Sequence, residues 1–356
     1  MALNRLVRTR RIADLSPRDL GDSLESTMDR VGAALGGRRR PWWRWALPSW
    51  MAREGLVVDE HIREGRFQIS LALIAGISSL LSGWEVATEH YRGSYSQRIM
   101  YSPLLLSPLL LVAGVAGAVS RRAARTILPF LSLLTVVDGF VGFWFHVRGV
   151  HRKPGGWRIP VANVIMGPPV FAPLLFALSG YLGLMAAMLR REGDPPGSVP
   201  AAWPRGAGGW LGLVPHVLIA EEQQVREGRF QKQLAAAAAA SAVFSGIEAL
   251  YSHYKNNFNY RVQWTPIILT PALVAAGIGG VFSRRVARTW LPLVSAAAML
   301  DGAIGSLYHL RGVLRRPGGL KLPLHNLMYG PPIFAPLLFA ASGFLGLLAS
   351  LLQRAE

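Results

Sequence analysis

Cysteine is absent from the 356 residues of the chain. Its absence excludes disulfides, thiolate metal sites, cysteine-held iron–sulfur clusters and covalently attached c-type haem. The chain also has no nucleophile elbow, no Walker-type phosphate loop, no Rossmann fingerprint and no HExxH zinc motif. We therefore predict no independent hydrolytic or nucleotide-driven activity. As an enzyme, the chain would act as an electron-transfer subunit of a membrane oxidoreductase.

Charged side chains are also scarce. They make up 16% of the residues, whereas soluble domains usually contain roughly 25%. Hydrophobic residues make up 51%, and several apolar runs reach the roughly 20 residues that a helix needs to cross a bilayer. The sequence therefore predicts an all-α integral membrane protein with eight transmembrane helices. The runs cover residues 67–90, 103–120, 127–147, 169–189, 230–253, 266–283, 290–310 and 332–352.

Acidic residues are few beside basic ones, which leaves a formal net charge of +18. Nucleic-acid-binding proteins show similar excesses of basic residues. The position of the charge along the chain therefore decides whether nucleic-acid binding or membrane topology explains it. If alternate loops face opposite sides of a bilayer, 26 of the 38 Lys and Arg lie on the side of the chain ends and 12 on the other. The positive-inside rule then predicts that both termini are cytoplasmic. Topology and anionic lipids explain the charge, and no nucleic-acid partner is expected.

The sequence repeats itself without a gap at an offset of 163 residues. VDGFVGFWFHVRG at 137–149 returns as LDGAIGSLYHLRG at 300–312, and REGRFQ occurs at 63–68 and 226–231. The embedded acids and histidines keep both position and identity, whereas other apolar stretches diverge freely. An even number of spans in each half gives the two halves the same orientation in the membrane.

This pattern predicts two tandem, parallel four-helix repeats with two connecting segments. Residues 1–66 form a cytoplasmic or interfacial N-terminal segment, and residues 193–226 form a cytoplasmic linker with an interfacial helix. Residues 67–192 and 227–356 are the membrane repeats, here called repeat A and repeat B.

Acids and histidines recur inside the apolar runs. A charge near the bilayer centre costs about 2.5–3.5 kcal/mol, so such residues usually face a bundle interior, a cavity or a partner. Four such positions recur in each repeat, two acids and two histidines on its first and third spans. They are Glu85, His90, Asp138 and His146 in repeat A, and Glu248, His253, Asp301 and His309 in repeat B.

A single shared metal ion fits these groups poorly. Glu85 and His90 lie about 140° apart around a helix, and Asp138 and His146 lie about 12 Å apart along one. The Glu-x-x-His pattern of di-iron bundles is missing as well. His90 and His146, however, both lie toward the non-cytoplasmic ends of their spans. Two imidazoles from separate helices can sandwich one b-type haem, so the sequence predicts up to two haems, one in each repeat.

Glycines and arginines accompany the histidines. A glycine seven residues before each histidine lies on the same helical face, about 10 Å deeper. A flat macrocycle needs such clearance, but so does close packing of two helices. These glycines are Gly83, Gly139, Gly246 and Gly302. Nearby arginines are expected to pair with haem propionates, with snorkelling to the interface as the alternative. They are Arg98, Arg148, Arg261 and Arg311.

The sequence thus predicts a membrane redox subunit that passes electrons between a quinone and an extracytoplasmic dehydrogenase or cytochrome. The four acids are expected to relay protons or to bind the quinone, with interhelical hydrogen bonding as the structural alternative. Two other functions stay open. One is an ion-coupled or proton-coupled transporter or channel lined by these acids. The other is a non-catalytic membrane anchor or assembly protein, which needs no cofactor.

Overall fold

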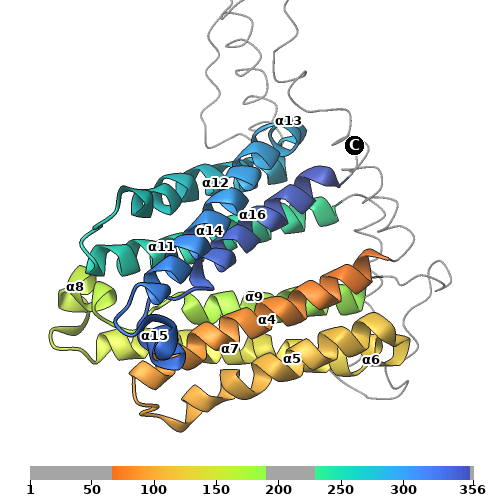
Figure 1. Cartoon of the computed structure of the whole chain (residues 1–356). Coiled ribbons are helices and arrows are strands. Elements are labelled where there is room, and N and C mark those ends of the chain that lie inside the picture. The colour runs from red at the N-terminus through yellow and green to blue at the C-terminus, as the bar shows by residue number, and fades with distance from the viewer. Residues whose placement is uncertain (1–65, 190–228, 353–356) are drawn as a thin grey trace, which may run out of the picture.

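The computed structural model describes residues 66–189 and 229–352 (Figure 1). Every regular element within these two ranges is a helix. Apart from Arg66, the predicted N-terminal segment (1–66) and the predicted linker (193–226) lie outside the described residues. The boundaries expected for those segments stay predictions.

Six helices of the described part are long and apolar enough to cross a membrane. They carry the candidate spans of an all-helical integral membrane protein. The helices are α4 (Phe67–Arg92), α5 (Ser102–Val119), α7 (Ile127–His151), α11 (Phe230–Lys255), α12 (Thr265–Phe282) and α14 (Trp290–Leu314).

Two further apolar helices are shorter than the sequence predicts. α9 (Ala172–Met188) and α16 (Ala335–Leu351) have 17 residues each, which gives a length of about 25 Å against a hydrocarbon core of about 30 Å. The predicted runs begin three residues earlier, at 169 and 332. The helix starts late because Pro173, near its first residue, has no N–H to donate to the carbonyl of residue 169, and its ring would clash with that carbonyl. Pro336 has the same effect on residue 332 in the second range.

Short helices lie at the two ends of the long helices (Figure 1). One end holds α6 (Arg121–Arg125) and α13 (Arg284–Arg288), and the other holds α8 (Pro160–Ile165) and α15 (Pro323–Tyr329). The helix bounds of the second range follow those of the first at the sequence offset, except that α15 is one residue longer than α8. For example, α4 begins at 67 and α11 at 230, which is 67 + 163, and they end at 92 and 255, which is 92 + 163.

Each described range packs as a four-helix bundle. α5 and α9 both contact α4 and α7, so α4 and α7 occupy diagonal corners, and α12 and α16 stand in the same relation to α11 and α14. One hydrophobic core then joins the two bundles, built mainly from α4, α9, α11 and α16. Phe67 and Phe230, which occupy matching positions, meet edge to face with ring centres 6.4 Å apart.

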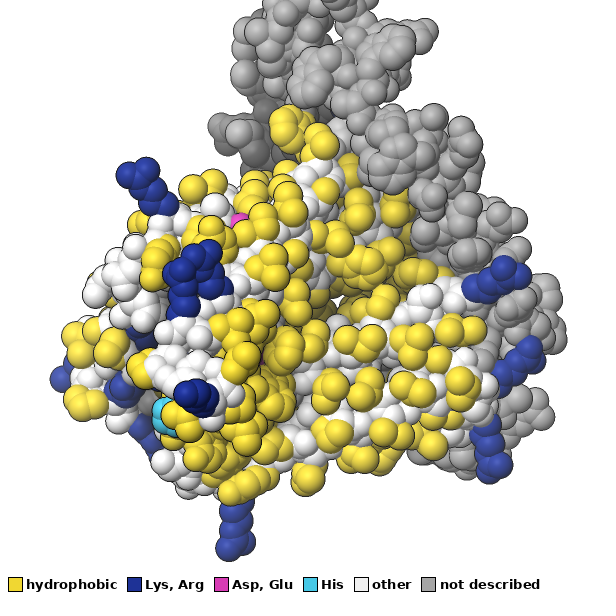
Figure 2. All heavy atoms as spheres, in the orientation of Figure 1, with side chains coloured by type: hydrophobic (Ala, Val, Ile, Leu, Met, Phe, Trp, Pro, Cys, Tyr) yellow, Lys and Arg dark blue, Asp and Glu magenta, His cyan; other side chains and the backbone are white. Residues whose placement is uncertain are grey.

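The remaining long helices turn apolar side chains outward. Leu105 of α5, Trp144 of α7, Ile268 of α12 and Leu300 of α14 are each more than 60% exposed. Figure 2 shows hydrophobic side chains over the flanks of the bundles, with Lys and Arg toward the two ends. Such a surface matches a hydrocarbon layer bounded by two polar interfaces, which associates the protein with a lipid bilayer.

Small residues bring neighbouring helices into close contact. A Cβ on Gly114 of α5 would lie 2.5 Å from the carbonyl oxygen of Ala72 on α4, which leaves no room for a side chain. Gly277 meets Ala235 of α11 in the same way, at 2.9 Å. Approaches of this kind are common between membrane helices, where small residues let two backbones pack closely.

We predict that Gly114→Ala lowers stability by about 1–3 kcal/mol, because the added methyl group must push α5 away from the α4 backbone. Thermal unfolding of the purified protein in detergent micelles measures the change. Gly93→Ala is the control, because its Cβ would meet nothing closer than 3.5 Å. Equal melting temperatures for the two variants would show that the α4–α5 contact is not close.

Candidate functional site

The histidines predicted as a pair come together in each half. His90 near the end of α4 and His146 near the end of α7 have ring centres 6.4 Å apart, with an interplanar angle of 64°. His253 of α11 and His309 of α14 also lie 6.4 Å apart, at 77°. The diagonal helices of each bundle therefore approach one another through imidazole rings at the end that carries α8 and α15.

Each of these rings binds a backbone carbonyl through Nδ1. In the first bundle, His90 Nδ1 lies 2.8 Å from the carbonyl oxygen of Met100, and His146 Nδ1 lies 2.5 Å from that of Pro169. A carbonyl oxygen can only accept, so each Nδ1 carries the proton and donates it. In the neutral ring, Nε2 then keeps a free lone pair, which is the form that binds a metal.

The second bundle repeats these hydrogen bonds. His253 Nδ1 lies 2.9 Å from the carbonyl oxygen of Gln263, and His309 Nδ1 lies 2.5 Å from that of Pro332. In both bundles one partner precedes the second helix and the other precedes the fourth. The loops that begin these helices therefore orient all four rings.

The predicted aspartates bind hydroxyl groups at the start of a neighbouring helix. Ser102 of α5 donates to the Asp138 carboxylate at 2.5 Å, and Thr265 of α12 donates to Asp301. Ser102 and Thr265 are matching positions, since 102 + 163 = 265. The predicted role of these acids in proton transfer or quinone binding stays a prediction, whereas the helix-to-helix bond is present in the structure.

The predicted glutamates link the two bundles. Glu85 of α4 accepts a hydrogen bond of 2.7 Å from the Phe334 amide at the start of α16, in the other bundle. Glu248 of α11 accepts one of 2.7 Å from the Phe171 amide at the start of α9. Each carboxylate thus caps a helix of the opposite bundle, where it satisfies a free amide and faces the positive end of the helix dipole. Their predicted role toward protons or quinone likewise stays a prediction.

The four glycines beneath the histidines lie at helix–helix contacts. A Cβ on Gly83 would collide with Ser107 of α5, and one on Gly139 would lie 2.5 Å from Ala177 of α9. Gly246 meets Thr270 of α12, and Gly302 meets α16. These are the contacts expected for close helix packing, the second of the two roles that the sequence allows.

The four arginines stand on the surface at the histidine end. Arg98 and Arg261 begin short 3-10 helices, and Arg148 and Arg311 follow their histidines by two residues. All four side chains are exposed. This placement fits snorkelling to the interface and leaves each guanidinium available to an anionic group near the rings.

An aromatic stack covers each histidine pair, a feature that the sequence alone did not reveal. Tyr95 stacks on Tyr101 at 4.6 Å and meets His90 edge to face at 6.1 Å. In the second bundle, Phe258 stacks on Trp264 at 4.1 Å and meets His253 at 6.2 Å. The 163-residue offset relates both pairs, so matching aromatic residues in the two loops were the available signal.

The backbone at these stacks is strained. Ser94 and Tyr95 have φ of 59° and 45°, and Asn257 and Phe258 have φ of 54° and 46°. Residues other than glycine adopt this left-handed region at a cost of about 1–3 kcal/mol, and they do so mostly where the surroundings fix them. Burial raises the pKa of the Tyr95 phenol, so the hydroxyl that donates to the Ala87 carbonyl stays protonated.

We predict that Glu85→Ala destabilises the protein by about 1–2 kcal/mol, because it removes a carboxylate that caps a partly buried helix end. Unfolding in detergent micelles measures the loss, and Glu248→Ala is expected to match it. Glu89→Ala is the control on the same helix, since the Glu89 side chain is 44% exposed and, among residues 66–189 and 229–352, forms its ion pair with Arg92 three positions further on. A loss for Glu89→Ala as large as for Glu85→Ala would contradict the cross-bundle cap.

Comparison of the chain with models of protein families, with curated proteins and with solved structures gave no match.

Proposed function

We propose that the protein is an integral membrane redox subunit in which each bundle holds one b-type haem between His90 and His146, or between His253 and His309. The paired imidazoles carry this proposal. When bound, haem iron supplies one-electron transfer. Two one-electron sites in one chain suit a quinol, which releases two electrons and two protons.

The separation of the rings supports this ligation. A histidine nitrogen lies about 2.0–2.1 Å from a bound metal, and the ring centre lies about 1.1 Å behind the nitrogen, so two imidazoles on opposite sides of one iron have centres roughly 6.3 Å apart. Both pairs have centres 6.4 Å apart. The hydrogen bonds at Nδ1 add to the argument, because metal-binding histidines usually donate their second ring N–H to a carbonyl or carboxylate.

A macrocycle fits the donor set better than a bare ion does. Within residues 66–189 and 229–352, no three His, Cys, Asp or Glu side chains gather in a way that could hold a metal ion. Two imidazoles alone leave most coordination positions of an ion open, whereas a porphyrin supplies four nitrogens of its own. Arg98 and Arg148, with Arg261 and Arg311 in the second bundle, are the residues that would bind the propionates.

We further propose eight spans in two tandem parallel repeats, with α9 and α16 completing the crossing and both termini in the cytoplasm. The basic turns at α6 and α13 then face the cytoplasm, as the positive-inside rule requires. The histidine pairs lie at the other end. From that face the protein would exchange electrons between a quinone in the membrane and an extracytoplasmic dehydrogenase or cytochrome.

The distribution of acids favours redox chemistry over transport. The described residues contain five acids, namely Glu85, Glu89, Asp138, Glu248 and Asp301. Glu85 and Glu248 hold helix ends, Asp138 and Asp301 bind hydroxyls at the first residues of α5 and α12, and Glu89 pairs with Arg92. Asp138 and Asp301 lie at the middle of α7 and α14, and no described acid lies nearer to α6 and α13, where an ion path would have to continue.

The haem proposal predicts a reduced-minus-oxidised difference spectrum with a b-type α-band in protein purified from haem-replete cells. Extraction as pyridine haemochrome should give about two haems per chain. His146→Ala should halve that content, and a variant that also carries His309→Ala should be colourless, because each substitution removes one of the two histidines that would hold the haem of its bundle.

His151→Ala is the matched control, because His151 is also a histidine at the end of α7 but has no counterpart at 314. It should leave the haem content unchanged. Circular dichroism checks that each variant stays helical. A colourless, folded wild-type protein from haem-replete cells would refute the haem proposal and favour a transport or assembly function.

The topology can be tested separately, because a chain without cysteine gives no background in thiol labelling. We predict that Lys153→Cys, between α7 and α8, reacts with a membrane-impermeant maleimide on intact cells. Arg122→Cys in α6 should react only after the membrane is opened. Reaction of both positions on intact cells would contradict the proposed orientation and the even number of spans.

A further inference from the structure

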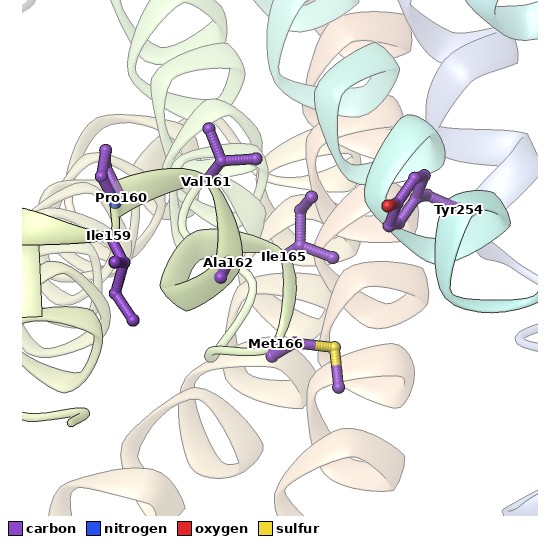
Figure 3. Close-up of a pocket in the computed structure, with 7 residues that line it drawn as sticks. All are labelled: Ile159, Pro160, Val161, Ala162, Ile165, Met166 and Tyr254. Carbon is purple, nitrogen blue, oxygen red and sulfur yellow. The ribbon is translucent and has the colours of Figure 1, made fainter. Parts of the chain in front are cut away.

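An apolar cavity that is open to the surface lies between the two bundles at the histidine end, and Ile159, Val161 and Met166 in its lining are each at least half exposed. It has a volume of about 580 Å³ and is lined by residues 159–162, Ile165 and Met166 of the α8 region and by Tyr254 of α11 (Figure 3). Tyr254 is the only lining residue with a hydrogen-bonding side chain, and its hydroxyl points toward α8 in Figure 3. The cavity therefore offers one phenol opposite an aliphatic wall.

In the equivalent region between α15 and α4 there is direct contact between the two elements, in place of a cavity. Tyr329 meets Tyr91 edge to face, with ring centres 6.2 Å apart. Arg92 donates to the carbonyl oxygens of Met328 at 2.8 Å and Gly330 at 2.7 Å. A ring contact and two charge-assisted hydrogen bonds thus fasten the α15 region to the end of α4.

Three differences between the halves accompany the open α8 side. At the offset of 163 residues, Met166 and Ala162 correspond to Tyr329 and His325, whose rings lie 4.9 Å apart. Lys255 corresponds to Arg92, whereas Tyr254 and Tyr91 are both tyrosines. Lys255 is exposed, and within the described residues its ammonium makes no bond to the carbonyls of α8. An ammonium lacks the planar fork with which a guanidinium binds two carbonyls at once.

We propose that this cavity is the binding site of a lipid-soluble quinone, with its ring against the α8 wall and one carbonyl oxygen accepting a hydrogen bond from Tyr254. The inference deepens the proposed redox function, since it gives the electron partner a site, although quinone binding can be measured whether or not haem is present.

The chemistry of the lining suits this occupant. Small-molecule pockets typically have volumes of about 300–1,000 Å³, apolar walls and a few polar groups that orient the ligand. A quinone ring needs an apolar surface and a donor at its carbonyl oxygen, and a phospholipid chain needs no donor. The cavity also adjoins the proposed electron site, because Tyr254 directly follows His253 on α11. Exposed apolar residues at its rim, including Val161 and Met166, allow entry from the outer leaflet.

The test titrates the purified full chain in detergent micelles with decylubiquinone by isothermal calorimetry. We expect one site per chain. Tyr254→Phe should weaken binding roughly 3- to 10-fold, the effect of one net hydrogen bond. Tyr91→Phe, the matched substitution on the closed side, should leave binding unchanged. Closing the cavity with Met166→Tyr and Lys255→Arg together should abolish binding.

The reverse set of substitutions, made on the closed α15 side, is expected to create a second quinone site. Misfolding of the variant could not produce such a gain. Arg92→Lys, Tyr329→Met and His325→Ala together reproduce the α8 side at α15 and should raise the stoichiometry from one quinone to two. Decane, which has the tail length but no ring, is the competitor. Equal displacement of the quinone by decane, together with no effect of Tyr254→Phe, would assign the cavity to an acyl chain and overturn the proposal. Quinone binding by a colourless protein would instead refute only the haem proposal.

Discussion

Polar groups that lie inside a membrane protein must find partners within the protein, and this constraint organises the histidine end of the structure. Helices α9 and α16 begin at partly buried residues and leave free amides there. An amide that is withdrawn from water without a partner is costly. Glu85 and Glu248 satisfy these amides from the opposite bundle. Each of these hydrogen bonds joins one bundle to the other. Pairing of the two helix ends therefore helps, with the shared hydrophobic core, to fix how the bundles pack together.

The same constraint explains why the histidines are so closely oriented. Their Nδ1 atoms bind carbonyl groups of residues that precede α5, α9, α12 and α16. One nitrogen of each ring, Nδ1, therefore already donates a hydrogen bond within the protein. The other nitrogen of each ring is left for a ligand, and the two free nitrogens of a bundle come from diagonal helices. The redox proposal thus depends on a hydrogen-bond network that has a structural role in its own right.

Much of this could be predicted from the sequence, and the failures have physical causes. Long apolar runs located the six long helices, and the 163-residue offset matched elements in the two ranges. The depth of His90 and His146 along their runs predicted that the two rings would meet. Helix periodicity describes one helix at a time, however, so it did not show that Glu85 would bind Phe334, 249 positions away. The hydropathy of the run also placed the start of α9 too early, because Pro173 prevents a helix from beginning at residue 169 however apolar the run is.

The offset shows which residues are equivalent, but contacts are needed to show which differences matter. Met166 and Tyr329 differ visibly in the sequence, yet only the neighbouring Tyr91 and Arg92 show that one side is fastened and the other open. Under the redox proposal, two haem sites would need no such asymmetry for electron transfer alone, whereas one entry point for a two-electron donor would account for it. The open cavity and both histidine pairs lie toward one end of the helices, and no described acid lies nearer to the other end than Asp138 and Asp301, at the middle of α7 and α14. Exchange with a quinone would therefore take place along one membrane face, without a charge crossing the apolar half that leads to α6 and α13.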